Sequence, residues 1–100
     1  MSAQRLSGSP ELPELRDEIR AIDEELLGLV RRRLEVARRV AEAKRKAGLP
    51  VLDPAREAAV VRYAAEFARE HDLAEEDVRA LYWSLVGLTR RAELTEPASR

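Results

Sequence analysis

Two cations on one predicted helix have a spacing that suits the binding of a small anion. Arg33 stands where the surrounding apolar pattern calls for a hydrophobic side chain, so a charge falls on the packing face of the helix. Lys44 follows three helical turns later, to within about 20°, so both side chains project from nearly the same face. Their long stems can converge on one dianion. In the simpler alternative, Arg33 reaches the surface or pairs with a glutamate of another helix.

A second group of polar residues falls near the ends of other predicted helices. Asp53, Arg56 and Glu57 lie in or next to the first turn of a helix, where free backbone N–H groups favour anions. The plain alternative is that Asp53 is an N-cap and that the other two are solvent-exposed charges. Thr89 and Glu93 lie one turn apart near the end of the last predicted helix, where the carboxyl is either a surface group or a buried acid.

A long helix must carry the first of these groups. Apolar residues recur in alternating steps of four and three, which is a heptad seam; they are Leu15, Ile19, Ile22, Leu26, Leu29, Val36, Val40 and Ala43. Gly48 provides a left-handed stop, so we expect a helix from about Glu14 to about Ala47, with a span of roughly 50 Å. Two shorter helices of the same chain cannot cover so long a rod, so part of the seam should pack on another subunit.

Arg16 stands beside this seam, near the start of the long helix. By helical rise it lies about 25 Å from Arg33, so the two side chains cannot share a site within one chain. If two copies of the helix pack antiparallel about a two-fold axis, Arg16 of one chain approaches the middle of the other helix. A complete site would then need the dimer.

Two shorter helices should follow the long one. Asp53 and Pro54 form a strong helix start, with Asp as N-cap and Pro at the first position, and this helix should run to about His71. The third helix should run from about Glu75 to Leu94. The expected inward positions of the two helices are Val60, Val61, Ala64, Phe67 and Ala68, and Val78, Leu81, Tyr82, Leu85 and Val86. With no β pattern, the predicted fold is all-α, with one long and two shorter helices.

The composition limits the chemistry that is available. The 100 residues contain no cysteine and one histidine, which excludes disulfides and a thiol nucleophile and argues against a zinc site. The 18 Lys and Arg residues against 19 Asp and Glu give no overall field that would attract nucleic acid. No apolar run is long enough for a membrane span, and the first residues lack a secretory signal. We therefore expect a cytoplasmic protein with neither nucleic-acid nor membrane partners.

The same patterns divide the chain into three regions. Residues 1–13, with their serines, glycine and prolines, are expected to be a flexible N-terminal arm. Residues 14–95 should form the folded domain, and residues 96–100 a disordered tail.

The chain resembles the all-helical, type II chorismate mutases in the order and spacing of several short motifs. These motifs are Leu15–Ile19 (LRDEI), Ile22–Leu27 (IDEELL), Arg33, Ala43–Lys44 and Gly48–Glu57 (GLPVLDPARE). Each piece alone is weak, but their ungapped succession is specific, and the match covers about residues 15–94. The resemblance implies an intertwined antiparallel homodimer that converts chorismate to prephenate, in phenylalanine and tyrosine biosynthesis, without a cofactor.

That reaction is an intramolecular Claisen rearrangement with no covalent intermediate and no proton transfer, so the site only has to hold and polarise its substrate. The resemblance implies that Arg33, and Arg16 of the partner chain, bind the two substrate carboxylates, for which the planar guanidinium is well suited. It assigns Lys44 to a carboxylate and to the ether oxygen, which gains negative charge as its C–O bond breaks. Such prearranged charges favour the polarised transition state over the extended ground state.

The resemblance also implies roles toward the ring hydroxyl, a carboxylate and the ether oxygen of the substrate. Glu57, together with the backbone near Asp53, should hold the ring hydroxyl, and Arg56 should assist at the carboxylate end. Position 93 departs from the family, because many bacterial members carry glutamine opposite the ether oxygen; Thr89 falls where serine is common. An ionised Glu93 would repel the developing charge, so we hypothesise that it acts protonated, as a hydrogen-bond donor, with its pKa raised by burial.

Other functions stay open at this point. Two sister enzymes share this fold: a mutase for 4-amino-4-deoxychorismate, and a lyase that removes pyruvate from isochorismate. The Glu57 carboxylate suits a hydroxyl, but it could equally hold an ammonium group. Alternatives from another class are a helical module that dimerises or regulates an aromatic-pathway enzyme, and a basic coiled coil that binds nucleic acid. An aromatic-pathway enzyme is also a candidate partner that would activate a mutase of this class. The balanced charge argues against nucleic-acid binding by the last of these.

Overall fold

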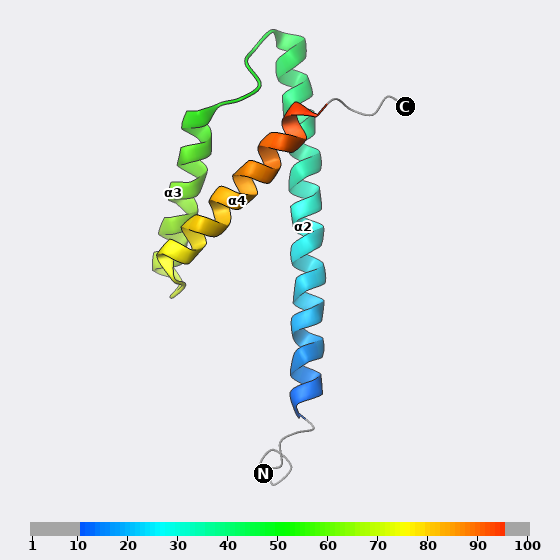
Figure 1. The fold of residues 1–100 in the computed structure, drawn as a ribbon, viewed down its shortest axis with the longest axis vertical. Helices are drawn as coiled ribbons and strands as arrows, with labels where there is room; N and C mark the ends of the chain where they lie inside the picture. The colour runs from blue at the N-terminus through cyan, green and yellow to red at the C-terminus, as the bar shows by residue number, and fades with distance from the viewer. Residues whose placement is uncertain (1–10, 96–100) are drawn as a thin grey trace. The chain divides into compact units, whose positions relative to one another are not determined.

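The computed structural model describes residues 11–95, which form three α-helices: α2 (Glu11–Ala47), α3 (Pro54–Glu70) and α4 (Glu75–Leu94) (Figure 1). The predicted all-α class, with one long and two shorter helices, is confirmed. Residues 1–10 of the expected arm and the expected tail, residues 96–100, lie outside the described residues. The chain divides within α2 into two units, Met1–Arg32 and Arg33–Arg100.

The start of α2 lies earlier than the sequence suggested. The helix begins at Glu11, whereas the predicted start was about Glu14, so residues 11–13 of the expected arm are helical. Pro13 does not prevent this, because proline is tolerated in the first turn of a helix, where the backbone N–H that it lacks would have no intrahelical partner. Glu11 and Glu14 in this turn also complement the positive end of the helix dipole.

The end of α2 is set by Gly48, as predicted. Gly48 has a φ of 72°, a conformation that costs glycine little because it has no Cβ. The N–H of Gly48 donates to the carbonyl of Arg45 at 3.1 Å, and that of Leu49 donates to the carbonyl of Lys44 at 2.8 Å. This pair of bonds is a Schellman motif, which satisfies two carbonyls of the last turn and redirects the chain toward α3.

Local signals also set the ends of the two shorter helices. The Asp53 carboxylate accepts a hydrogen bond from the Arg56 backbone N–H at 3.2 Å, and Pro54 occupies the first helical position. Both features were predicted, and they fix where α3 begins. Asp72 has a φ of 61° in the short turn after α3, a conformation that aspartate adopts more readily than most residues. The bounds of α4 are those predicted.

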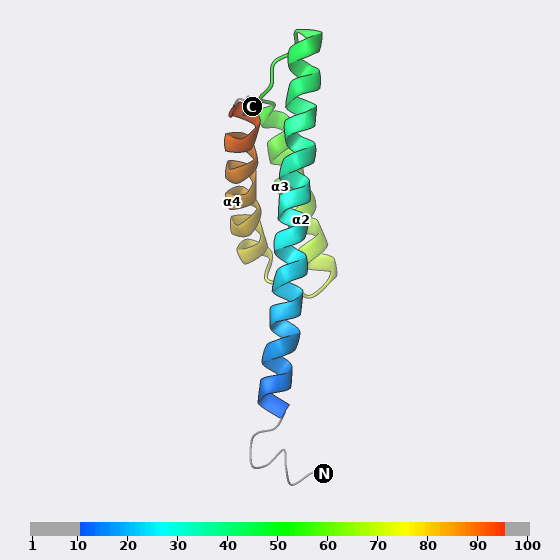
Figure 2. The same ribbon diagram turned by 90° about the vertical axis from the view of Figure 1, so that its right-hand side faces the viewer.

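The two shorter helices pack against each other within the Arg33–Arg100 unit, as an antiparallel hairpin (Figure 2). The buried side chains of this unit are small: Ala41, Val61, Ala64, Ala65, Ala68, Val86 and Ala92. Alanines let helix backbones approach closely, at the cost of a core with little apolar volume. Of the predicted inward positions, Val61, Ala64, Ala68 and Val86 are confirmed as buried.

Two of the predicted inward positions are wrong for the single chain. Phe67 is 43% exposed and Leu81 is 64% exposed. The ring of Phe67 instead stacks on that of His71, with ring centroids 3.8 Å apart. None of the helices formed by residues 11–95 combines the length and apolarity that a membrane span requires.

Candidate active site

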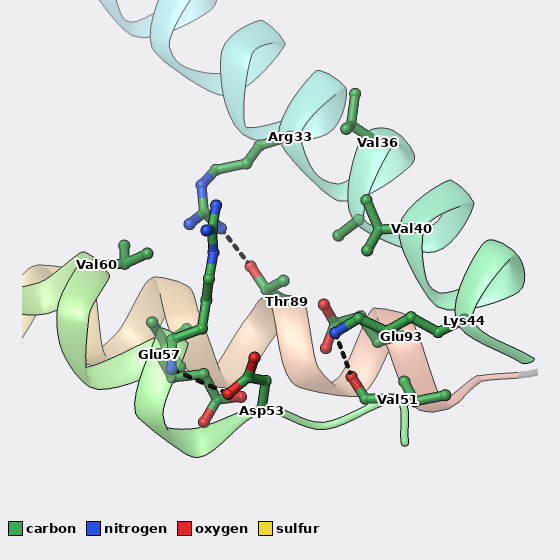
Figure 3. A pocket seen from close by; sticks show the side chains of 13 residues that line it. Arg33, Val36, Val40, Lys44, Val51, Asp53, Glu57, Val60, Thr89 and Glu93 are labelled. Carbon is green, nitrogen blue, oxygen red and sulfur yellow. Dashed lines mark hydrogen bonds between the residues drawn. The ribbon is translucent and has the colours of Figure 1, made fainter. Parts of the chain in front are cut away.

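A pocket of about 500 Å³ lies within the Arg33–Arg100 unit, bordered by the second part of α2, the loop before α3, and helices α3 and α4 (Figure 3). Seven of the eight candidate residues from the sequence line it: Arg33, Lys44, Asp53, Arg56, Glu57, Thr89 and Glu93. Its apolar walls come from Val36, Ala37, Val40, Val51, Val60 and Val86. The volume is in the usual range of small-molecule sites. The eighth candidate, Arg16, belongs to the Met1–Arg32 unit and is not among the lining residues.

A hydrogen bond between α2 and α4 orients the Arg33 guanidinium. Its Nη1 donates to Oγ1 of Thr89 at 2.7 Å (Figure 3). The same Thr89 hydroxyl donates to the Leu85 carbonyl at 2.8 Å. The threonine hydroxyl is therefore fixed by its own helix and acts as an acceptor for the arginine. A guanidinium has five N–H donors, so this one bond orients the group and leaves capacity to bind an anion.

Lys44 lies at the other end of the pocket, in the last turn of α2. Its Nζ donates to the Val51 carbonyl at 3.2 Å, which ties the end of α2 to the loop before α3 (Figure 3). An ammonium group has three donors, so the bond to Val51 positions the charge without exhausting its capacity. Arg33 and Lys44 thus reach the same pocket from one helix face, as their spacing predicted.

Asp53 and Arg56 have a simpler local role than their place in the pocket lining suggests. The Asp53 carboxylate caps α3 by accepting the Arg56 backbone N–H, and both residues are exposed in the single chain. Asp53 is therefore the N-cap of α3, as predicted, and it also lines the pocket. The cap directs the first turn of α3 toward the pocket, which brings the Glu57 carboxylate to its wall.

Sequence reasoning missed Arg90, which holds Glu57 in place. Nε of Arg90 donates to Oε2 of Glu57 at 3.3 Å, and Nη2 donates to Oε1 at 2.5 Å, so the two planar groups meet as a fork. The Glu57 side chain is only 15% exposed, against 43% for Arg90. The hydrogen bonds that Arg90 donates to Glu57 raise the pKa of Arg90 above its ordinary value. The only sequence signal was the position of Arg90 beside Thr89 and one turn before Glu93.

The Glu93 carboxyl lies among charges from all three helices. Its pKa is raised above the ordinary value, chiefly because burial penalises the charged form, and Glu57 adds to the effect. Lys44 and Arg33 from α2, and Arg90 from α4, act in the opposite direction. The raised pKa agrees with the direction expected from sequence for a carboxyl that holds its proton in the pocket.

Arg45 is a second residue whose contact could not be foreseen. Nη2 of Arg45 donates to the backbone carbonyl of Glu93 at 2.5 Å. A cation at this place satisfies a carbonyl in the last turn of α4 and complements the negative end of the helix dipole. In the sequence Arg45 resembles an ordinary solvent-exposed charge, yet in the structure it holds the backbone from which Glu93 projects.

The site can bind and polarise an anion. Within residues 11–95, no group of three or more His, Cys, Asp and Glu side chains is arranged to hold a metal ion. Two cations from one face of α2, a carboxylate held by Arg90 and a half-buried carboxyl surround an apolar-walled cavity. Such an arrangement can stabilise charge that develops within a small dicarboxylate.

Comparison with known proteins agrees with this chemistry. The model of the family "Chorismate mutase type II" matches residues 15–94. The chain is 40% identical over 72 residues to a 4-amino-4-deoxychorismate mutase of Streptomyces venezuelae, which covers 72% of this chain and 70% of that protein. It is 36% identical over 64 residues to a chorismate mutase of Methanocaldococcus jannaschii, covering 64% of this chain and 65% of that protein.

A third relative is much longer than this chain. The bifunctional chorismate mutase/prephenate dehydratase of Aquifex aeolicus is 53% identical over 47 residues, which are 47% of this chain but only 13% of that protein. The family match nevertheless covers most of the chain, including all eight candidate residues. The protein therefore belongs to the type II chorismate mutase family.

Proposed function

We propose that the protein is a chorismate mutase that converts chorismate to prephenate by electrostatic stabilisation of the transition state. The observation that carries this proposal is the pocket itself, in which Arg33 and Lys44 from α2 meet Glu57 from α3 and Glu93 from α4. Chorismate carries two carboxylates and an ether oxygen that becomes negative during the rearrangement. A cavity with two cations directed into it from one helix suits both the binding of the carboxylates and the stabilisation of the charge on the ether oxygen.

In this proposal the two arginines bind the carboxylates. Arg33 meets one of them, with its guanidinium oriented by Thr89 so that little side-chain freedom is lost when the substrate binds. The other is met by Arg16 of a second chain. Lys44 reaches a carboxylate and the ether oxygen from the end of α2, where its bond to Val51 places it.

Glu93 and Glu57 take the remaining two polar groups of the substrate. A protonated Glu93 donates a hydrogen bond to the ether oxygen and so stabilises the charge that accumulates there. Its half-buried position and raised pKa support this assignment. Glu57 accepts a hydrogen bond from the ring hydroxyl, and the fork with Arg90 holds its carboxylate for that purpose.

The proposal includes an antiparallel homodimer. Apolar side chains in the first part of α2 are strongly exposed in the single chain: Leu15, Ile19, Ile22 and Leu26 are between 43% and 59% exposed. A regular heptad stripe of this kind is suited to helix–helix packing. We propose a second copy of the chain as the partner that covers this stripe. It would bring its Arg16 to a pocket whose own cations are Arg33, Lys44 and Arg56.

The second candidate is a mutase of 4-amino-4-deoxychorismate. It is favoured by the name of the Streptomyces venezuelae relative, which matches 72% of this chain. The rearrangement is the same in both cases, and the substrates differ at the ring carbon that Glu57 would face. The nature of the group beside Glu57 is therefore the feature that separates the two candidates.

The first test is direct. The purified protein should convert chorismate to prephenate near neutral pH, followed by the loss of chorismate absorbance. Replacing Arg33→Ala should lower kcat/KM by about 10²–10³-fold, because one oriented donor to a bound anion is lost. Arg62→Ala, at an exposed position on α3, is the matched control and should retain activity. If the folded protein does not turn over chorismate, the proposal is refuted; if it also fails to turn over 4-amino-4-deoxychorismate, a non-catalytic helical module is favoured.

The second test concerns Glu93. A carboxyl with a raised pKa keeps its proton to higher pH, so activity should be highest below that pKa and should fall as the pH rises through it. Glu93→Gln should remove this alkaline loss, because the amide donates a hydrogen bond at every pH. The measurement is kcat/KM for chorismate across the pH range in both proteins. An equally steep alkaline loss in the Gln variant would show that another group titrates.

The third test asks whether Arg16 acts across a dimer. Arg16→Ala and Arg33→Ala should each be nearly inactive, but a 1:1 mixture after subunit exchange should recover about a quarter of the wild-type activity. Half of the dimers are then mixed, and each mixed dimer has one intact site. The control mixture, Arg33→Ala with Lys44→Ala, should recover nothing, because both residues come from the same chain. No recovery in the first mixture, with mixed dimers present, would rule out a shared site.

A further inference from the structure

The ion pair between Arg90 and Glu57 lies at the edge of the pocket, and in the proposed reaction Arg90 only holds the carboxylate in place. Glu57 is a lining residue, whereas its partner Arg90 of α4 is not. The fork occupies each carboxylate oxygen once, at 3.3 Å for Oε2 and 2.5 Å for Oε1. Each carboxylate oxygen has a second lone pair, so Glu57 can still accept one hydrogen bond from a substrate.

We propose that Arg90 is a specificity-determining residue, which makes the site select a neutral hydroxyl rather than an ammonium group at the ring carbon that faces Glu57. This inference rests on the proposed function. Arg90 acts through Glu57 and is a positioning residue, since it lies outside the pocket lining.

The charges around the pocket carry the argument. An unpaired carboxylate gives a cationic group a strong attraction, but a carboxylate already held by a guanidinium gives a pair with a net charge near zero. The other charged lining residues are the cations Arg33, Lys44 and Arg56 and the carboxyls of Asp53 and Glu93. Even with these two carboxyls ionised, the three lining cations together with Arg90 outnumber Asp53, Glu57 and Glu93 by four to three, so the surroundings of the ring group are not net negative.

A hydroxyl and an ammonium respond differently to these surroundings. A hydroxyl needs one acceptor and no net negative charge, so the second lone pairs of Glu57 suffice. An ammonium must lose its hydration and lie near Arg90 as well as Glu57, so the attraction of the carboxylate is largely offset. The pair therefore favours chorismate over its 4-amino analogue.

A purely structural role for Arg90 would have a different signature. The pair links α3 to α4, and loss of a mere tie between helices would lower the turnover of both substrates alike. Loss of a charge that discriminates between the substrates changes their ratio. The informative quantity is therefore kcat/KM for 4-amino-4-deoxychorismate divided by kcat/KM for chorismate, which does not depend on the fraction of folded protein.

The experiment measures this ratio in the wild type and three variants of the full chain. The wild type should prefer chorismate. Arg90→Met, which keeps an unbranched side chain but removes the charge and the donors, should raise the ratio by about three- to tenfold, the range expected for a partly exposed charged pair. Arg90→Lys, which keeps the charge, should stay near the wild-type ratio. Arg91→Met, at the exposed neighbouring position, is the control and should not change it.

Two results would overturn the inference. One is a wild type that prefers the 4-amino analogue, and the other is an unchanged ratio in Arg90→Met while both substrates are still turned over. A wild type that turns over neither substrate would instead refute the proposed function, so the two failures are distinguishable.

Discussion

A guanidinium on the packing face of a helix requires a polar partner there, and in this protein that partner is one threonine hydroxyl. Arg33 interrupts the apolar seam of α2, and Thr89 of α4 accepts its hydrogen bond at 2.7 Å. A polar group without a partner in this place would destabilise the packed helices. The same bond aims the guanidinium into the pocket, so the requirement of the fold and the requirement of the site are met by one contact. The position of α4 relative to the second part of α2 is thereby tied to the chemistry.

The other helix contacts support that arrangement. The alanine-rich contact between α3 and α4 sets their spacing, and Arg90 links the two helices through Glu57. The Schellman turn at Gly48 and the cap at Asp53 determine where the connecting loop begins and ends, and Lys44 is anchored to that loop through Val51. Because the buried side chains are small, polar contacts and caps contribute a large share of the order in this unit.

Much of this structure could be predicted from local signals. The stop at Gly48 and the start at Asp53 and Pro54 depend on capping chemistry within a few residues, and these predictions are confirmed. The predicted bounds of α4 are confirmed as well, although no side-chain cap marks its start at Ala74. The juxtaposition of Arg33 and Lys44 follows from helical periodicity alone. The start of α2 was placed too late, because a proline in the first turn does not end the helix on its N-terminal side.

The rest depended on tertiary packing that a single sequence does not specify. Arg90 and Arg45 resembled surface charges, because the rotation of α4 about its axis decides whether they meet Glu57 and the Glu93 carbonyl. Phe67 resembled a core residue, but the buried positions of α3 are occupied by alanines and one valine, and the Phe67 ring stacks on His71 instead. Helical periodicity identifies a face, whereas the partner that each residue meets is set by the depth and angle of packing.

The most direct test of this account is the effect of Thr89 on catalysis, measured as kcat/KM for chorismate in Thr89→Val and Thr89→Ser. Valine keeps the branched shape but removes the acceptor for Arg33, so the account predicts a fall of about tenfold or more, with the fold intact by circular dichroism. Serine keeps the hydroxyl and should retain most of the activity. Full activity in the valine variant would show that Arg33 is not oriented by Thr89, and would contradict the account.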